Sequence, residues 1–258
     1  MSARNRPLDG CRYARRMTDE LFRENATLFE CDAVVTAVDA RGVQLDRTVF
    51  YPLGGGQAGD RGVLRLADGR ELAIADTRKG GAPGEVLHLP APGQEPLLAA
   101  LAAGAPVRAR IDAGRRRRHM RFHTATHLLC ALVPHPVDGC SINADYARLD
   151  FHMTEPLDKQ ALNDGLARLV ALARPVRHRW IGEDELDANP QLVRSMSVQP
   201  PRGLGRVRVL EIEGVDLQPC GGTHVADTAE VGDVVVTKIE KKSAATRRVV
   251  LGFAAAPA

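Results

Sequence analysis

The chain has 258 residues, 44% hydrophobic and 26% charged, with a net charge of only +3, a balance typical of folded globular proteins. No apolar run approaches the roughly 20 residues that a membrane span needs, and residues 1–16 lack the apolar core of a secretory signal. Five scattered cysteines in a chain of this length indicate cytoplasmic thiols, so we expect a cytoplasmic protein without a disulfide framework or a membrane partner.

Residues 1–16 are polar, contain five arginines and show no periodic pattern. Met17 then begins a segment typical of a first helix or turn. We therefore predict that residues 1–16 form an extension of the domain, or that the true start is Met17. A short ordered arm is the alternative.

The N-terminal domain is assigned to residues 17–111. From Cys31 to about Ile111 it reads as a series of short strands that are rich in β-branched residues and separated by turn signals. One of these signals is the hairpin dipeptide Asp68–Gly69. Six short strands with almost no helical period predict a small β-barrel or sandwich as the N-terminal domain.

Residues 112–258 have a different character. Apolar positions recur at helical spacing over 119–133 and 158–174, whereas 206–212, 233–240 and 247–254 read as strands. We therefore predict an α+β chain, with the small β-barrel followed by an α/β domain.

The first candidate metal ligands lie on the predicted helix over 119–133. His123 and His127 are four residues apart, so they project from one face of that helix, one turn apart. They lie nearly opposite the apolar stripe, whereas a histidine that packs in the core would be expected on it.

A second half-site lies about a hundred residues further on, where Cys220 and His224 flank two glycines and a threonine. Two histidines from a helix and a Cys/His pair from a loop are the nitrogen and sulfur donors that zinc prefers in tetrahedral sites. We predict one zinc ion per chain, held by His123, His127, Cys220 and His224. Cys130 could replace one of the four, and a closed shell of four ligands is also the pattern of structural zinc.

A glycine-rich loop follows a predicted strand in the N-terminal domain. Gly54, Gly55 and Gly56 would let the backbone approach a ligand closely, and Gln57 offers both a donor and an acceptor. A merely flexible turn is the alternative. The loop is not a phosphate-binding P-loop, because no Gly–Lys–Ser/Thr follows.

Two basic clusters favour contact with a polyanion, although a solvated face is the alternative for each. The first leads into the histidine helix, and the second lies on the predicted C-terminal hairpin. Their members are Arg115, Arg116, Arg117, Arg118 and Arg121 in the first, and Lys238, Lys241, Lys242, Arg247 and Arg248 in the second. The low aromatic content of 4% argues against a platform that stacks successive bases.

Together these motifs resemble the alanyl-tRNA editing family, the free-standing AlaX proteins related to the editing domain of alanyl-tRNA synthetase. The resemblance covers about residue 17 to the end. It rests on four segments that occur in the family's order: DRTVFYPLGGGQAGDRG (46–62), RFHTATHLL (121–129), GCSINADYARLDF (139–151) and CGGTHVADTAEVG (220–232).

The resemblance implies a β-barrel that carries the GGGQ loop and an editing domain that holds zinc through His123, His127, Cys220 and His224. It implies that the loop residues help to shape the site, with Gln57 a candidate beside a zinc-associated water. It also implies that the segment over 139–151 lines the amino-acid pocket, where Cys140, Ser141 and Asp150 are candidates for sensing a serine hydroxyl.

The function that the resemblance implies is hydrolysis in trans of mischarged tRNA(Ala), chiefly Ser-tRNA(Ala) and then Gly-tRNA(Ala), at its acceptor end. The arginines at 115–118 and 121, with Lys241, Lys242 and Arg247, are the expected tRNA contacts. Two alternatives remain open. One is a deacylase of the kind found in threonyl-tRNA synthetase, and the other is a non-catalytic tRNA-binding module with structural zinc.

Overall fold

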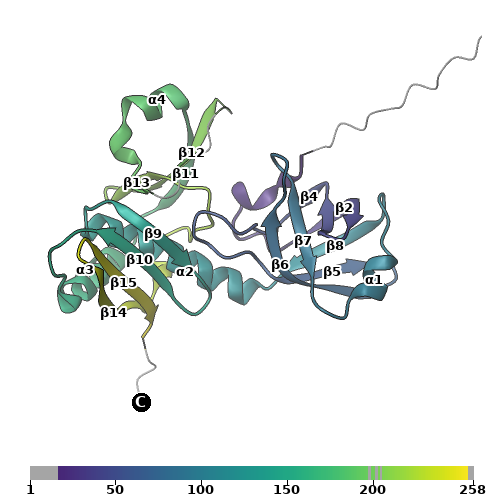
Figure 1. The fold of residues 1–258 in the computed structure, drawn as a ribbon, viewed down its shortest axis with the longest axis horizontal. Coiled ribbons are helices and arrows are strands. Elements are labelled where there is room, and N and C mark those ends of the chain that lie inside the picture. The colour runs from purple at the N-terminus through teal and green to yellow at the C-terminus, as the bar shows by residue number, and fades with distance from the viewer. Residues whose placement is uncertain (1–16, 197–198, 201–202, 204, 255–258) are drawn as a thin grey trace, which may run out of the picture.

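The computed structural model describes residues 17–196, 199–200, 203 and 205–254. The predicted extension over 1–16 lies outside these residues. Figure 1 shows a β-barrel on one side, a mixed α/β part on the other, and helix α2 running between them. The expected α+β architecture, with the barrel first along the chain, is confirmed.

Six antiparallel strands close the barrel in the order β2-β3-β7-β6-β5-β8. Alternation along the strands fills the interior with residues such as Leu45, Leu64 and Leu72, which are 0% exposed. The strands are β2 (Glu30–Asp39), β3 (Gly42–Leu45), β5 (Gly62–Leu66), β6 (Glu71–Lys79), β7 (Val86–Pro90) and β8 (Pro106–Ile111). Around them lie β1 (Asp19–Glu20), which pairs in parallel with β4 (Arg47–Thr48), the 3-10 turn η1 (Leu21–Arg23) and helix α1 (Glu95–Ala99).

Beyond the barrel, two helices pack against one face of a four-stranded sheet (Figure 1). Leu128 and Leu129 from helix α2 join Leu149, Phe151 and Leu251 from the sheet in one core. The helices are α2 (Ala113–Leu132) and α3 (Lys159–Ala171). The sheet has the order β14 (Val234–Ser243), β15 (Thr246–Phe253), β10 (Ala147–His152), β9 (Val137–Ile142).

A smaller three-stranded sheet lies between helix α3 and the Cys/His loop in the order of the chain. Its order is β11 (Val176–Gly182), β12 (Arg206–Ile212), β13 (Asp216–Pro219), with antiparallel pairing throughout. Helix α4 (Glu183–Ala188) and the 3-10 turn η2 (Pro190–Leu192) follow β11, and the 3-10 turn η3 (Thr228–Val231) follows the loop. No helix within the described residues is long and apolar enough to cross a membrane.

A buried ion pair ties the start of helix α2 to the barrel. Arg116 and Asp60 are 0% and 1% exposed, and the guanidinium donates to both carboxylate oxygens. It also donates to the carbonyl oxygens of Val49 and Ala26 at 2.6 and 2.9 Å. Because Arg116 is neutralised inside the protein, the tRNA contact predicted for this residue is wrong.

We expect Asp60→Ala to lower the free energy of unfolding by about 3–5 kcal/mol, because it leaves the Arg116 charge buried without its partner. Asp145→Ala is the matched control, since Asp145 pairs with Arg118 at 3.2 Å on the surface and such pairs contribute at most about 1 kcal/mol. Denaturant unfolding of both variants is the measurement. Equal losses would contradict the structural role of the buried pair.

A second buried polar group lies in the barrel. His88 is 0% exposed, with Nε2 2.8 Å from the Thr48 hydroxyl and Nδ1 2.9 Å from the Val43 carbonyl oxygen. Burial lowers the pKa of His88 to about 4, so the ring is neutral in the folded protein at neutral pH.

The unfolded chain binds a proton at this ring below about pH 6.5, whereas the folded protein does so only below about pH 4. The free energy of unfolding must therefore decrease as the pH is lowered from about 6.5 to about 4. Between about pH 7.5 and about pH 5, we expect His88 to remove about 2 kcal/mol from the free energy of unfolding. The measurement is denaturant unfolding of the wild type and His88→Gln at both pH values. An identical pH dependence in the two proteins would refute the assignment.

Candidate metal centre

The structure brings the four predicted metal ligands together. His123 and His127 come from the middle of helix α2, and Cys220 and His224 come from the loop after β13. Their ligand atoms all lie within 4.8 Å of one another. The three histidines are buried and Cys220 is half-buried. Cys130 is buried on the same helix but is not part of this group.

Each imidazole is oriented by a hydrogen bond at Nδ1. The partners are Gln57 Oε1 for His123 at 2.8 Å, Asp216 Oδ2 for His127 at 2.8 Å and Thr124 Oγ1 for His224 at 3.2 Å. The first two partners are pure acceptors, so those rings donate Nδ1–H to them and turn Nε2 toward the centre. Metal-binding histidines typically have such a partner on the other ring nitrogen.

The Nε2 atoms of His123 and His224 face the Cys220 sulfur at 3.4 and 3.2 Å. Burial would raise the pKa of the Cys220 thiol, but the neighbouring histidines outweigh burial and lower the pKa well below its usual value. Burial would likewise lower the pKa of His127, yet the hydrogen bonds to Asp216 and Cys220 raise it to about 10. A thiolate and three oriented imidazoles form a donor set that suits a divalent metal ion.

The glycine loop of the barrel attaches to the edge of β9. Ile142 N–H donates to the Gly56 carbonyl at 2.7 Å, and Ala58 N–H donates back to the Ile142 carbonyl at 3.0 Å. Gly56 has a φ of +84°, and a Cβ there would lie 3.0 Å from the carbonyl oxygen and the sulfur of Cys140, so a side chain would be both strained and crowded. The loop can therefore lie flat on β9 and extend Gln57 toward His123.

Gln57 is 0% exposed and uses both ends of its amide. Its Oε1 accepts from His123 and from the Thr223 backbone N–H at 3.1 Å, and its Nε2 donates to the Thr223 hydroxyl at 2.9 Å. Gln57 thus joins the barrel, helix α2 and the Cys/His loop. It lies behind the His123 ring, on the side away from the Cys220 sulfur.

The predicted pocket segment over 139–151 divides between the two faces of the sheet. Cys140 packs against the core and the glycine loop, and the Ser141 hydroxyl accepts from Asn143 at 3.2 Å. Asp150 alternates with the core residues Leu149 and Phe151, so it points to the opposite face.

The Asp150 carboxylate is fully engaged on that opposite face. It is 2% exposed and accepts from Arg248 at 2.7 Å, Lys242 at 2.8 Å and Arg148 at 3.1 Å. The prediction that Asp150 senses a serine hydroxyl is therefore wrong, because strand alternation directs its side chain away from the metal centre.

The basic residues of the helix α2 cluster differ in their surroundings. Arg117 and Arg118 are exposed and lie over the Phe29 and Phe253 rings, at 4.7 and 4.5 Å from the ring centroids. Arg115 is half-buried, and Arg121 is half-buried and donates to Asp233 and to the Val231 carbonyl. Only part of this cluster therefore faces solvent.

On the C-terminal hairpin, Lys241 and Lys242 are exposed, and their contact with tRNA stays a prediction. Arg247 is 8% exposed and its guanidinium donates to the carbonyl oxygens of Thr154 and Ser243. The expected tRNA contact of Arg247 is wrong, because its buried guanidinium is already bound to backbone carbonyl oxygens.

Sequence reasoning missed the residues that orient the ligands. Thr124 lies inside the HTATH motif and Thr223 inside CGGTH, so the motifs contained them without indicating a role. Asp216 belongs to no motif, and only the fold brings its carboxylate to His127. Arg208 is another such residue, since its guanidinium donates to the carbonyl oxygens of Cys220 and Gly222 at 2.9 and 3.2 Å.

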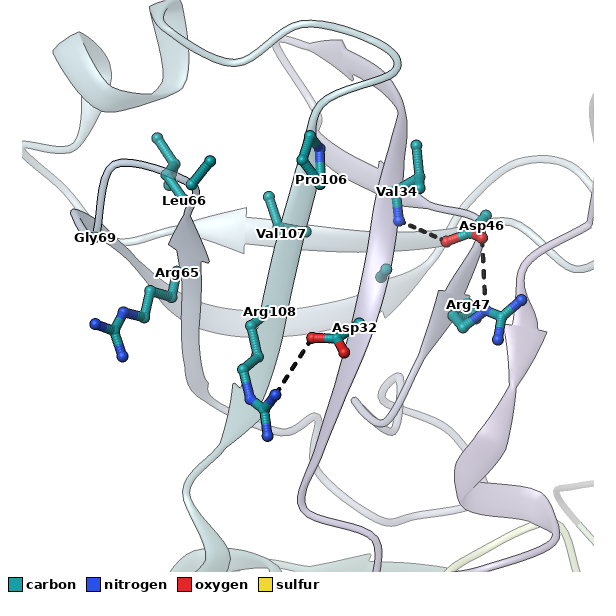
Figure 2. A pocket seen from close by; sticks show the side chains of 12 residues that line it. Asp32, Val34, Asp46, Arg47, Arg65, Leu66, Gly69, Pro106, Val107 and Arg108 are labelled. Atoms are coloured by element: carbon teal, nitrogen blue, oxygen red, sulfur yellow. Dashed lines mark hydrogen bonds and ion pairs between the residues drawn. The ribbon is translucent and has the colours of Figure 1, made fainter.

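A separate groove of about 670 Å³ lies on the outer wall of the barrel (Figure 2). Its charged residues largely pair with one another, as Arg108 does with Asp32 at 3.4 Å and Arg47 with Asp46 at 3.5 Å. None of its lining residues belongs to the metal centre or the glycine loop. The groove is therefore not the candidate site, despite its size.

Comparison with known proteins decides the family. The chain is 35% identical over 240 residues to the alanyl-tRNA editing protein AlaX-M of Methanosarcina barkeri, a match that covers 90% of this chain and 97% of that protein. It is 30% identical over 237 residues to AlaX-M of Saccharolobus solfataricus, covering 90% and 98%. The chain belongs to the AlaX-M family of alanyl-tRNA editing proteins.

Two further matches place the same region in larger enzymes. The chain is 33% identical over 243 residues to the alanine–tRNA ligase of Pyrococcus furiosus, which covers 90% of this chain but only 25% of that ligase. Residues 207–250 match the family model of the threonyl and alanyl tRNA synthetase second additional domain. This segment includes Cys220 and His224, so the Cys/His half of the metal centre lies inside it.

In this member of the AlaX-M family, replacing Gln57 tests whether its side chain holds His123 in place. Gln57→Leu keeps a similar volume but removes the acceptor of the His123 Nδ1 proton, and we expect the affinity for zinc to fall about 10–100-fold. Competition with a chromogenic chelator measures the change. Gln160→Leu, at an exposed glutamine on helix α3, is the control and should keep the wild-type affinity. Equal affinities in the two variants would show that Gln57 does not position His123.

Proposed function

We propose that this protein is a zinc-dependent deacylase that hydrolyses mischarged tRNA(Ala) in trans, chiefly Ser-tRNA(Ala) and secondly Gly-tRNA(Ala). The observation that carries the proposal is the group of His123, His127, Cys220 and His224, in a chain whose relatives are named alanyl-tRNA editing proteins. The match extends over 97% of the Methanosarcina barkeri protein, which supports action without attached synthetase domains.

The donor set favours zinc over harder ions. Three imidazole nitrogens and one thiolate are typical zinc ligands, whereas magnesium and calcium prefer oxygen. When bound, zinc supplies Lewis acidity toward an ester carbonyl or a water molecule.

The protein's own residues prepare the site for that chemistry. Gln57 and Asp216 hold protons on Nδ1 of His123 and His127, so both rings present Nε2 to the centre. Arg208 fixes the Cys/His loop through two carbonyl oxygens, and Thr223 closes the loop onto Gln57. Burial of the three histidines excludes most water, which strengthens each of these polar contacts.

An editing role agrees with the energetics of amino-acid selection. A pocket that must accept alanine distinguishes glycine or serine by only ~1–3 kcal/mol, because the difference is a single methylene or hydroxyl. A second hydrolytic site corrects the errors that follow. Cys140, which contacts Gly56 of the glycine loop, is the remaining candidate for contact with the amino-acid side chain. Ser141 lies opposite Arg148 in the sheet and so shares the outer face with Asp150.

Solvent-facing cations would hold the tRNA. Arg117 and Arg118 lie at the barrel end of helix α2, and Lys241 and Lys242 lie on the β14–β15 hairpin. Such residues attract a phosphate backbone and release its counterions. Arg115 and Arg121 are half-buried and could contribute through their exposed atoms.

The decisive experiment is a deacylation time course on labelled Ser-tRNA(Ala), with Ala-tRNA(Ala) in parallel, each with and without a zinc chelator. We expect rapid loss of serine alone, abolished by chelation and restored by zinc. Folded His123→Ala protein should be slower by about a hundredfold or more, since even residues that only orient zinc ligands cost 10–100-fold. His152→Ala, at an exposed histidine on β10, should keep full activity.

The other outcomes distinguish the alternatives. Cleavage of Ser-tRNA(Thr) but not of Ser-tRNA(Ala) would favour the threonyl type, which the matching family model also includes. Saturable tRNA binding without hydrolysis, together with unfolding on chelation, would identify a binding module with structural zinc. Full activity in metal-free protein would contradict zinc dependence.

A further inference from the structure

Two residues of the small sheet, Trp180 and Arg208, form a row with Cys220 of the following loop, so the row leads away from the metal centre. Trp180 of β11 lies directly opposite Arg208 of β12, and the Cys220 N–H donates to the Arg208 carbonyl at 3.1 Å. Directly opposed residues on paired strands place their side chains on the same face. Neighbouring strands are about 4.8 Å apart, so Trp180 lies roughly 10 Å from Cys220, a distance that one nucleoside can span.

Arg208, in the middle of the row, is a buried cation. It is 6% exposed and donates to the carbonyl oxygens of Cys220, Gly222 and Arg23. Its Nε–H has no hydrogen-bond partner, and no carboxylate of the described residues lies within ion-pair distance of it. The anion nearest in effect is the Cys220 thiolate, whose charge favours the protonated form of Arg208. Arg208 therefore belongs to the support of the Cys/His loop.

Trp180, at the outer end of the row, is the only tryptophan of the chain. It is half-buried, but it belongs to none of the hydrophobic clusters among the described residues. The apolar cluster of this sheet, with Ile181 and Val209, lies on the opposite face, so Trp180 is not needed to fill that core. The exposed guanidinium of Arg206 lies 4.5 Å from the Trp180 ring centroid.

We propose that Trp180 stacks on a base of the single-stranded 3′ end of the aminoacylated RNA while the aminoacyl ester lies at the metal centre. The inference rests on the proposed function and extends it to the way in which the substrate is held. Stacking accepts any base, because every base presents a π face. Arg208 holds the Cys/His loop beside the ester. The exposed guanidinium of Arg206, which lies beside the Trp180 ring, supplies the cation for the neighbouring phosphate.

Tryptophan fluorescence tests the contact directly, because Trp180 is the only tryptophan. The zinc-loaded protein is titrated with a short uncharged RNA hairpin that ends in single-stranded 3′-CCA, and with the same hairpin cut to a blunt end. We expect saturable quenching by the first hairpin and little by the second. No quenching by the overhang, or equal quenching by both RNAs, would overturn the proposal.

Substitutions supply the second test. Trp180→Leu keeps an apolar side chain but removes the π face, and we expect it to raise the KM for Ser-tRNA(Ala) about tenfold or more with kcat within about twofold. Trp180→Phe is the matched control and should stay within a few-fold of the wild-type KM. Unfolding midpoints of both variants verify that the sheet is intact.

The two tests separate this proposal from the deacylase assignment. A wild-type KM in Trp180→Leu, with normal hydrolysis, would overturn the stacking and leave the deacylase intact. If no ester is hydrolysed by the wild type, the deacylase assignment fails, and the fluorescence titration by itself supports or overturns the stacking.

Discussion

Helix α2 is the element on which the metal centre depends, and the buried pair of Arg116 and Asp60 holds it in place. Arg116 lies in the first turn of the helix and His123 and His127 lie two and three turns further on. Because a helix is stiff over this length, fixing its start against the barrel also fixes the positions of both histidines relative to the glycine loop. The desolvation cost of burying two charges is offset here by hydrogen bonds to both charged groups.

The metal centre is assembled from separate parts of the chain, and each histidine takes its orientation from a different one. The acceptor for His123 comes from the barrel loop, that for His127 from β13, and that for His224 from helix α2 itself. A shift of any one part would therefore misplace one ring. The site therefore needs close contact between the glycine loop and β9, and glycine at position 56 allows that contact without strain or crowding.

The sequence was sufficient to predict the fold class and the grouping of His123, His127, Cys220 and His224, because both depend on local signals. The HxxxH spacing defines one face of a helix, the CxxxH motif contains the glycines of a tight loop, and short alternating strands predict a barrel. The sequence could not predict which side chains of a charged run are buried and which face solvent. Arg116 and Arg117 are adjacent, yet one is buried against Asp60 and the other lies over Phe29 on the surface. The prediction for Asp150 was wrong for a similar reason, because the face toward which a strand residue points depends on the register of the whole sheet.

The barrel contributes to the metal centre by orienting a ligand, chiefly through Gln57. Without Gln57, the Nδ1–H of His123 would be buried beside Thr223 with no acceptor in place, at a cost typical of an unsatisfied polar group, about 1–3 kcal/mol. Loss of Gln57 would also let the His123 ring rotate and would remove two hydrogen bonds to Thr223 of the Cys/His loop. The barrel is therefore a structural partner of the site, while the ligands themselves all lie in helix α2 and in the loop after β13.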